Sequence, residues 1–177
     1  MTISRAARQS DFPARFQLIA AMNPCPCGHL GSLQRACRCS PDEAARYQSR
    51  LSGPLLDRID LQVEVPAVPL ATLAQAPDGE ASAVIAARVA AARERALQRQ
   101  GVLNHRLAGE ALERHAALDA AGSAFLESAA QRLGWSARGY HRVLRVARSI
   151  ADLAGSPSIT LPQLAEAIQY RRVLVLR

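Results

Sequence analysis

Residues 16–22, FQLIAAM, form a short uninterrupted apolar run that follows Pro13 and stops at Asn23-Pro24. Such a run is typical of a strand buried on both faces, and strands of that kind belong to parallel sheets covered by helices. Residues 60–65, DLQVEV, alternate more and end at Pro66, which predicts a second strand. Because two strands do not make a stable sheet alone, we expect an α/β fragment, the last strands of a larger parallel sheet.

Between these two strands the sequence carries the start signals of a helix. Ser40 suits the N-cap, Pro41 the first helical position, and Asp42 and Glu43 the first turn, so a short helix is predicted over residues 41–51. After the second strand, residues 66–79 contain three prolines and resemble no regular element. This stretch is the best candidate linker in the chain.

Beyond the linker the pattern becomes helical. Residues 79–100 show apolar positions at helical spacing among Arg and Glu, and they end at Gly101. Further helices are predicted over residues 108–115, 118–133, 136–153 and 161–171, which are separated by Asp, Gly and Ser-Pro breakers. The expected organisation is an α/β part (1–68), a linker (69–79) and an all-α bundle (80–177), mostly helical overall.

The composition permits a folded core and a polyanionic partner. The chain has 177 residues, 49% of them hydrophobic, a net charge of +7 and a pI near 10.2. All 22 basic residues are Arg, a bias that GC-rich codon usage also produces. The sequence has no apolar stretch typical of a membrane span or a signal peptide, so we expect a cytoplasmic protein without a membrane partner.

The absence of lysine limits the nucleotide chemistry that the chain can perform. A phosphate-binding loop of the GxxxxGK[ST] type needs its Lys to reach the β and γ phosphates, and the sequence contains none. Asp42 and Glu43 follow a Cys-Ser-Pro turn rather than an apolar strand, so they do not resemble Mg²⁺-binding carboxylates. Any nucleotide site in this chain must therefore be partial.

Four cysteines lie within 15 residues of one another. Cys25 and Cys27 form one CxC pair, and Cys37 and Cys39 form a second after nine intervening residues. Four thiolates so close together suit tetrahedral Zn²⁺, although CxxC is the more usual spacing. The alternatives are a redox pair or unliganded thiols, and His29 is a possible substitute ligand.

Two polar residues follow or precede the predicted strands. Asn23 lies at the carboxyl end of the first strand, where open α/β sheets place ligand-contacting groups, although Asn-Pro also terminates strands. Arg58 follows the Ser52-Gly53-Pro54 turn, at a position from which a guanidinium could reach a neighbouring subunit and stabilise a transferring phosphoryl group. The competing interpretation is a surface ion pair with Asp57 or Asp60.

Arg138 lies at the start of a long predicted helix with Ser136 as its N-cap. The helix N-terminus and the guanidinium together favour an anion. Trp135, just before this helix, is expected to be a packing anchor. More arginines follow along the helix at three-residue spacing and indicate a solvated or interdomain face: Arg142, Arg145 and Arg148.

Several longer strings, in this order, resemble the C-terminal portion of bacterial magnesium-chelatase-like AAA+ ATPases of the ComM/YifB group. They are ISRA, FPARFQLIAAMNPCPCG, SGPLLDRIDLQVEVP, ARGYHRVLRVARSIADLAG and LAEAIQYR. The resemblance covers nearly the whole chain. It implies a homo-hexameric motor with ATP and Mg²⁺ bound between subunits, an AAA+ core over the α/β part and a helical lid over the bundle.

The resemblance also implies roles for single residues. Asn23 resembles the sensor-1 residue, which positions the attacking water, and Arg58 resembles the arginine finger, which acts in trans on the adjacent subunit's ATP. Arg138 resembles the sensor-2 arginine. Residues 2–12 resemble the returning half of a hairpin that projects toward the central pore and DNA. Cys25, Cys27, Cys37 and Cys39 belong to the PCPCG and CRC blocks.

Those cysteine blocks favour the ComM-like group over the ATPase subunit of a magnesium chelatase. The ComM-like resemblance implies ATP-driven movement on DNA, notably helicase action in branch migration during natural transformation. Two interpretations from other classes stay open, a zinc-dependent nucleic-acid-binding module and an oligomerisation bundle. Because the family's phosphate-binding loop and Mg²⁺-binding carboxylates are not in this sequence, we expect the chain by itself to hydrolyse no ATP.

Overall fold

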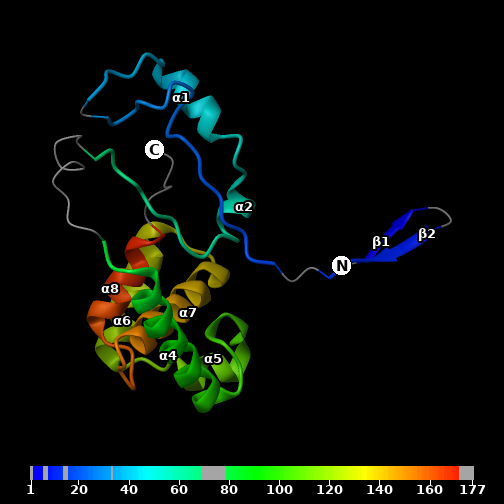
Figure 1. The fold of residues 1–177 in the computed structure, drawn as a ribbon, viewed down its shortest axis with the longest axis vertical. Coiled ribbons are helices and arrows are strands. Elements are labelled where there is room, and N and C mark those ends of the chain that lie inside the picture. Colours follow the sequence, from blue (N-terminus) through cyan, green and yellow to red (C-terminus); the bar gives the residue numbers. More distant parts are fainter. Residues whose placement is uncertain (1, 6–7, 14–15, 33, 69–78, 172–177) are drawn as a thin grey trace. The chain divides into compact units, whose positions relative to one another are not determined.

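The structure is a computed structural model that describes residues 2–5, 8–13, 16–32, 34–68 and 79–171 (Figure 1). Its contacts divide the chain into two compact units, Met1–Gln48 and Ser49–Arg177, which we describe separately. The fold class is as predicted, an α/β start followed by a helical bundle, and the helices dominate. In the described residues, no helix combines the length and apolar character needed to cross a membrane.

The first unit begins with an antiparallel hairpin of β1 (Thr2–Arg5) and β2 (Arg8–Asp11), drawn in dark blue in Figure 1. Thr2 pairs with Asp11, and the register continues to the last pair before the turn. The hairpin is exposed where its side chains are described. Residues 2–12 were predicted as the returning half of a hairpin, whereas the structure forms both strands within them.

The predicted strand over Phe16–Met22 is wrong for this structure. The segment has no regular secondary structure, and its side chains are exposed, with 79% of Phe16 and 86% of Ile19 accessible to solvent. The physical reason is that a buried strand needs partners on both edges and faces, and no described segment supplies them. An apolar run therefore lies extended without a sheet.

The predicted strand over residues 60–65 is not formed either. Its backbone makes one cross-chain hydrogen bond, from the Gln62 N–H to the Tyr170 carbonyl at 2.8 Å, and Val65 is 85% exposed. One bond does not make a ladder, so the alternating pattern is present in the sequence without the sheet that it needs.

The remaining element of the first unit, α1 (Pro41–Gln48), confirms the predicted helix start. The Glu43 N–H donates to Ser40 Oγ at 3.2 Å, and the Ser40 N–H donates to Glu43 Oε2 at 2.8 Å. This reciprocal capping box satisfies two N–H groups that the first turn would otherwise leave unpaired. The helix ends three residues before the predicted limit of residue 51.

The second unit is helical, and its helices follow the sequence prediction to within a few residues. Figure 1 shows most of them gathered into one bundle. In chain order they are α2 (Gly53–Leu56), α4 (Ser82–Gln100), η1 (Asn104–Arg106), α5 (Gly109–His115), α6 (Ala120–Leu133), α7 (Ala137–Leu153) and α8 (Leu161–Gln169). The predicted linker falls largely on residues 69–78, which lie outside the described residues.

Helix α7 is the centre of the bundle. It contributes Val143, Ala147 and Ala151 to the core at four-residue spacing, so one stripe faces the neighbouring helices. The other elements close over it with Leu112, Leu126 and Leu164, which are almost fully buried. A contiguous apolar core of this kind is what allows the helical unit to be stable by itself.

A buried ion network also joins α4 and α7. Asp152 is almost fully buried and accepts hydrogen bonds from Arg99 at 2.5 and 2.9 Å, from Arg148 at 3.0 Å and from the Asn104 amide at 2.8 Å. Arg95 adds a bond to the Asp152 backbone carbonyl at 2.8 Å. With its lone pairs satisfied, the carboxylate fixes the angle between the two helices.

Candidate functional site

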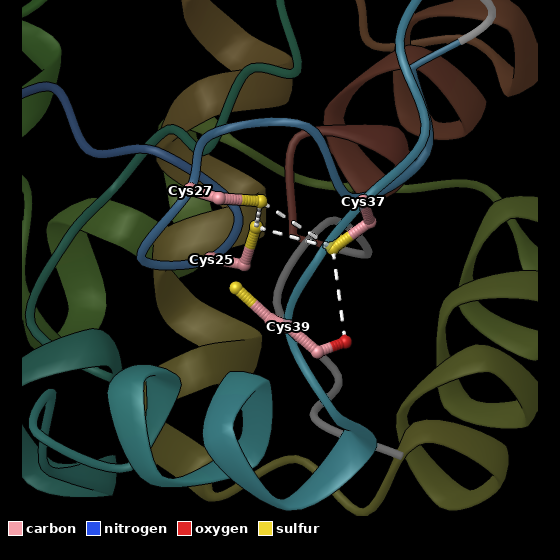
Figure 2. A group of neighbouring side chains, drawn as sticks. All are labelled: Cys25, Cys27, Cys37 and Cys39. Carbon is pink, nitrogen blue, oxygen red and sulfur yellow. Dashed lines mark hydrogen bonds between the residues drawn. The ribbon is translucent and has the colours of Figure 1, made fainter.

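The four cysteines converge on one point in the first unit, as Figure 2 shows. Sγ of Cys25 lies 3.4 Å from Sγ of Cys27 and 3.7 Å from Sγ of Cys37, and Cys27 and Cys37 are 3.6 Å apart. With Cys39 included, all four sulfur atoms lie within 4.8 Å of one another. All four thiols are free, so this cluster could hold a metal ion.

The pKa values of Cys27 and Cys39 are shifted in opposite directions. Backbone N–H groups of Arg38 and His29 lower the pKa of Cys27 to about 5. The Cys27 backbone N–H lowers the pKa of Cys39, but desolvation and the sulfur atoms of Cys27 and Cys25 outweigh it and raise that pKa to about 12. Crowded thiols resist ionising together, because each new negative charge repels the others.

Two tight turns shape the loop that carries the cysteines. The Gly28 N–H donates to the Cys25 carbonyl at 3.0 Å, and the Ser32 N–H donates to the His29 carbonyl at 3.0 Å. Gly28 and Gly31 have φ values of +79° and +78°, which a residue with a side chain rarely adopts. The His29 side chain is half-buried and is not one of the clustered metal donors.

Asn23 lies at the base of this loop. A Cβ atom placed on Gly28 would be 3.6 Å from Asn23 Nδ2 and 3.7 Å from Asn23 Cγ, so the carboxamide lies beside Gly28, on the side where a Cβ would stand. The next residue, Pro24, accepts a hydrogen bond from Gln48 Nε2 at the end of α1, at 2.9 Å. The structure therefore brings the predicted Asn23 and the predicted cysteine cluster together in one unit.

Arg58 is exposed and lies in the second unit, just after α2. Its Nη1 donates to the Pro54 carbonyl at 2.8 Å, and no carboxylate among the described residues lies within ion-pair distance of it. The alternative interpretation, a surface ion pair with Asp57 or Asp60, is therefore wrong. Both aspartates pair with other side chains, and the Arg58 guanidinium bonds the Pro54 carbonyl instead.

Asp57 and Asp60 attach residues 57–60, the arginine segment that contains Arg58, to the helical bundle. Asp57 accepts from Ser136 Oγ at 3.2 Å and from Arg171 Nη2 at 3.0 Å, and Asp60 pairs with Arg142 on α7. Arg171 also donates to the Ile59 carbonyl at 3.1 Å. Sequence reasoning missed these contacts, since the pairs are separated by about eighty or more residues along the chain.

Arg138 is exposed in the first turn of α7, two residues after the N-cap. The Gly139 N–H donates to Ser136 Oγ at 3.1 Å, which confirms the predicted cap. A Cβ on Gly139 would lie 3.6 Å from both Asp57 Oδ1 and Arg171 Nη2, so the arginine segment packs closely against this helix end. Arg58 and Arg138 are thus carried by one compact unit.

The surroundings of α7 also decide two weaker predictions. Trp135 packs against the apolar core, as expected of an anchor. Arg142 and Arg148 are used in ion pairs with Asp60 and Asp152 rather than presented to solvent, and Arg145 donates to the Leu107 carbonyl at 3.0 Å. The three-residue spacing of the arginines did not distinguish an internal ion network from a solvated face. The only local sign of the internal network was Asp152, which lies four residues after Arg148.

Comparisons with known proteins cover both parts of the chain. The family described as magnesium chelatase, subunit ChlI C-terminal, matches residues 79–171, and the family described as magnesium chelatase, subunit ChlI, matches residues 1–73. The chain therefore belongs to the magnesium chelatase ChlI family.

Within that family the chain is similar to the ComM and YifB proteins. It is 47% identical to the competence protein ComM of Haemophilus influenzae and 44% identical to the YifB protein of Salmonella typhimurium. Each alignment covers 97% of this chain and 34% of the relative. The chain thus spans about a third of the length of the curated relatives that it matches.

Proposed function

We propose that this chain is the sensor- and finger-bearing part of a hexameric ATP-driven motor that acts on DNA, of the ComM type. The observation that carries the proposal is Arg58, an exposed guanidinium whose two neighbouring aspartates are both paired with other side chains. An arginine that stabilises a phosphoryl group on another subunit must not be neutralised by its own chain. This pattern supports the arginine-finger role.

In this proposal Arg58 reaches the ATP bound to the adjacent subunit. Its forked donors stabilise the charge that spreads over the γ-phosphoryl oxygens during transfer, a contribution of about 10³ to 10⁵ in kcat for known fingers. ATP with Mg²⁺ is the cofactor, and the phosphate-binding loop that holds it lies outside this sequence, which contains no lysine.

Arg138 and Asn23 complete the set. Arg138 stands in the first turn of α7, where unpaired backbone N–H groups and the helix dipole favour a phosphate. Asn23 offers a carboxamide that can hold the attacking water in line with the γ-phosphate. The net charge of +7 and the exposed β1–β2 hairpin support a DNA partner.

We also propose Zn²⁺ as the ion held by Cys25, Cys27, Cys37 and Cys39. A Zn–S bond of about 2.3 Å in a tetrahedral site places the sulfur atoms about 3.8 Å apart. The sulfur separations among Cys25, Cys27 and Cys37, which are 3.4, 3.6 and 3.7 Å, lie close to that value. Metal analysis of the purified chain should give one zinc per chain, and a clearly smaller ratio after preparation with added Zn²⁺ contradicts the assignment.

The finger is tested by joining this chain to the remaining two thirds of the Haemophilus influenzae relative. We expect the chimera to hydrolyse ATP and Arg58→Ala to reduce kcat by at least about 10³-fold. Mixing Arg58→Ala with a chimera that lacks the lysine of the phosphate-binding loop should restore turnover. Each variant supplies in trans what the other lacks, so absence of complementation argues against action between subunits.

Arg50→Ala is the matched control. Arg50 is exposed, precedes α2 and has no ion-pair partner among the described residues. It removes the same charge from the same region without touching the proposed site. Normal turnover in Arg58→Ala would overturn the finger, and an equal loss in Arg50→Ala would show that the effect is one of net charge only.

A further inference from the structure

The first unit has almost no apolar core of its own. Among the described residues before Ser49, only Cys25 and Ala44 are buried, and the longest apolar run, residues 16–22, is exposed. Hydrophobic burial of this extent stabilises a fold by very little compared with the chain entropy that opposes it. Something other than burial must fix the loop between Asn23 and α1.

The cysteines are placed so that one ion would fix that loop at both ends. Cys25 begins the turn closed by the Gly28 N–H and Cys27 lies within it, and Cys39 directly precedes Ser40, the N-cap of α1. Figure 2 shows the sulfur atoms from these two separated parts of the chain meeting. A closed four-thiolate site contributes folding energy directly, because the unfolded chain has no preformed site.

The loop in turn holds Asn23. Its exposed carboxamide lies beside Gly28, and Gln48 at the end of α1 donates to the Pro24 carbonyl. These contacts form a closed ring of connections. The ion site would join the Gly28 turn to the start of α1, and Gln48 at the end of α1 bonds Pro24, the residue that follows Asn23. The Asn23 side chain is exposed and makes no hydrogen bond with another described residue.

We propose that the cysteine centre is a positioning device for Asn23, so that Zn²⁺ binding sets the orientation of this carboxamide. The inference rests on the zinc site proposed above, and its consequence for ATP turnover rests on the proposed motor function. Loss of the metal, or oxidation of two thiols to a disulfide by an external oxidant that takes up two electrons while two protons leave, would release Asn23 without altering Arg58 or Arg138.

The sequence offers a direct readout. It contains two asparagines, Asn23 and Asn104, so asparagine labelled with ¹⁵N in its side chain gives two amide signals. Asn104 is buried in the helical unit, where it bonds Asp152 at 2.8 Å and Ser149 at 3.2 Å. It serves as the internal control, and Asn23→Asp identifies the other signal.

Zn²⁺ is titrated into the metal-free chain while both signals are followed. We expect the Asn23 amide signals to shift and to stop changing at one equivalent, and those of Asn104 to stay in place. Bound zinc without any change at Asn23 overturns the positioning role. Failure to bind zinc, read independently by metal analysis, overturns the inference together with the zinc site.

Gln48→Ala tests the ring without removing a thiol. It should keep one zinc per chain but lose most of the zinc-dependent shift at Asn23, because the tie from α1 to Pro24 is gone. Gln34→Ala is the matched control. Gln34 is exposed in the loop between the two cysteine pairs, and its side chain makes no hydrogen bond with another described residue. Equal shifts in the two variants contradict the ring.

In the ATP-hydrolysing chimera, Cys37→Ser should lower kcat by up to about 10²-fold with little change in KM, as expected for a misplaced group. Asn23→Ala should have a similar effect, and the double variant should be no worse than the more impaired of the two. Additive losses overturn a shared role. If the unaltered chimera hydrolyses no ATP, the proposed motor function fails, but the amide titration still decides whether zinc positions Asn23.

Discussion

The two units of this chain are stabilised by different means. The helical unit has a contiguous apolar core around α7 and a buried ion network at Asp152. The first unit has two buried residues in its described part and a cluster of four thiols instead. The difference teaches that the helices are stabilised by their own apolar core. The loop that contains Asn23 has no such core and depends instead on the four cysteine side chains.

The largest expected effect is that of removing metal. A strong chelator should abolish the ordered structure of residues 23–48, since structural zinc contributes about 10 to 16 kcal/mol in small zinc-folded modules. The thermal unfolding midpoint of the helical unit should stay unchanged. Amide hydrogen exchange resolved along the chain measures the first effect and a thermal melt of the chelated protein the second, and loss of protection in α6 or α8 on chelation would contradict the comparison.

The second-largest effect is expected from a substitution in the helical unit, not in the cysteine cluster. Asp152→Asn leaves Arg148 without its buried counter-charge and should destabilise the helical unit by about 3 to 5 kcal/mol, measured by urea unfolding. Zinc stoichiometry should not change. Asp119→Asn is a milder comparison, because Asp119 only caps α6 through the Gly122 N–H, a role that Asn also fills.

Lowering the pH should weaken the same ion network around Asp152. Burial alone would raise the pKa of Asp152, but hydrogen bonds from Arg99 and Asn104 and the charge of Arg148 lower it overall. A carboxyl whose folded-state pKa is depressed contributes stability above its unfolded pKa, and that contribution is lost as the pH falls through the folded pKa. Below about pH 4 the unaltered helical unit should therefore lose stability, while Asp152→Asn should show a flatter pH dependence.

The smallest effect concerns the attachment of the arginine segment. Ser136→Ala removes the N-cap of α7 and the bond to Asp57, and should cost about 1 kcal/mol in the free energy of unfolding. Ser123→Ala, in α6, has no capping role and should cost less. A loss as large as that of Asp152→Asn would mean that the cap, and not the ion network, dominates the helical unit.

The helices could be predicted from the sequence because their signals are local. Ser40, Ser136, Gly101 and Gly134 mark ends of helices within a few residues of the apolar stripe that they limit. The cysteine cluster was predictable for a similar reason, since its four members lie within fifteen residues. The sequence pattern could not identify which distant residues contact one another.

The failures concern contacts between distant residues. The apolar run at 16–22 has the composition of a buried strand, yet burial depends on neighbours that no described segment provides. The Asp57–Arg171 contact joins residues far apart in the sequence, and no local rule selects Arg171 over Arg58 for that carboxylate. The domain boundaries at 68 and 80 stay a prediction, although contacts place residues 49–68 with the helices.

The attachment of residues 57–60 to α7 has a mechanical consequence. Ser136 donates to Asp57 and Arg142 pairs with Asp60, which fastens this segment to the N-terminal part of α7, while Arg171, just after α8, also donates to Asp57. Arg58 lies between the two anchored aspartates, so a displacement of α7 would carry its backbone along. The position from which its exposed side chain reaches outward is therefore set by the helical unit.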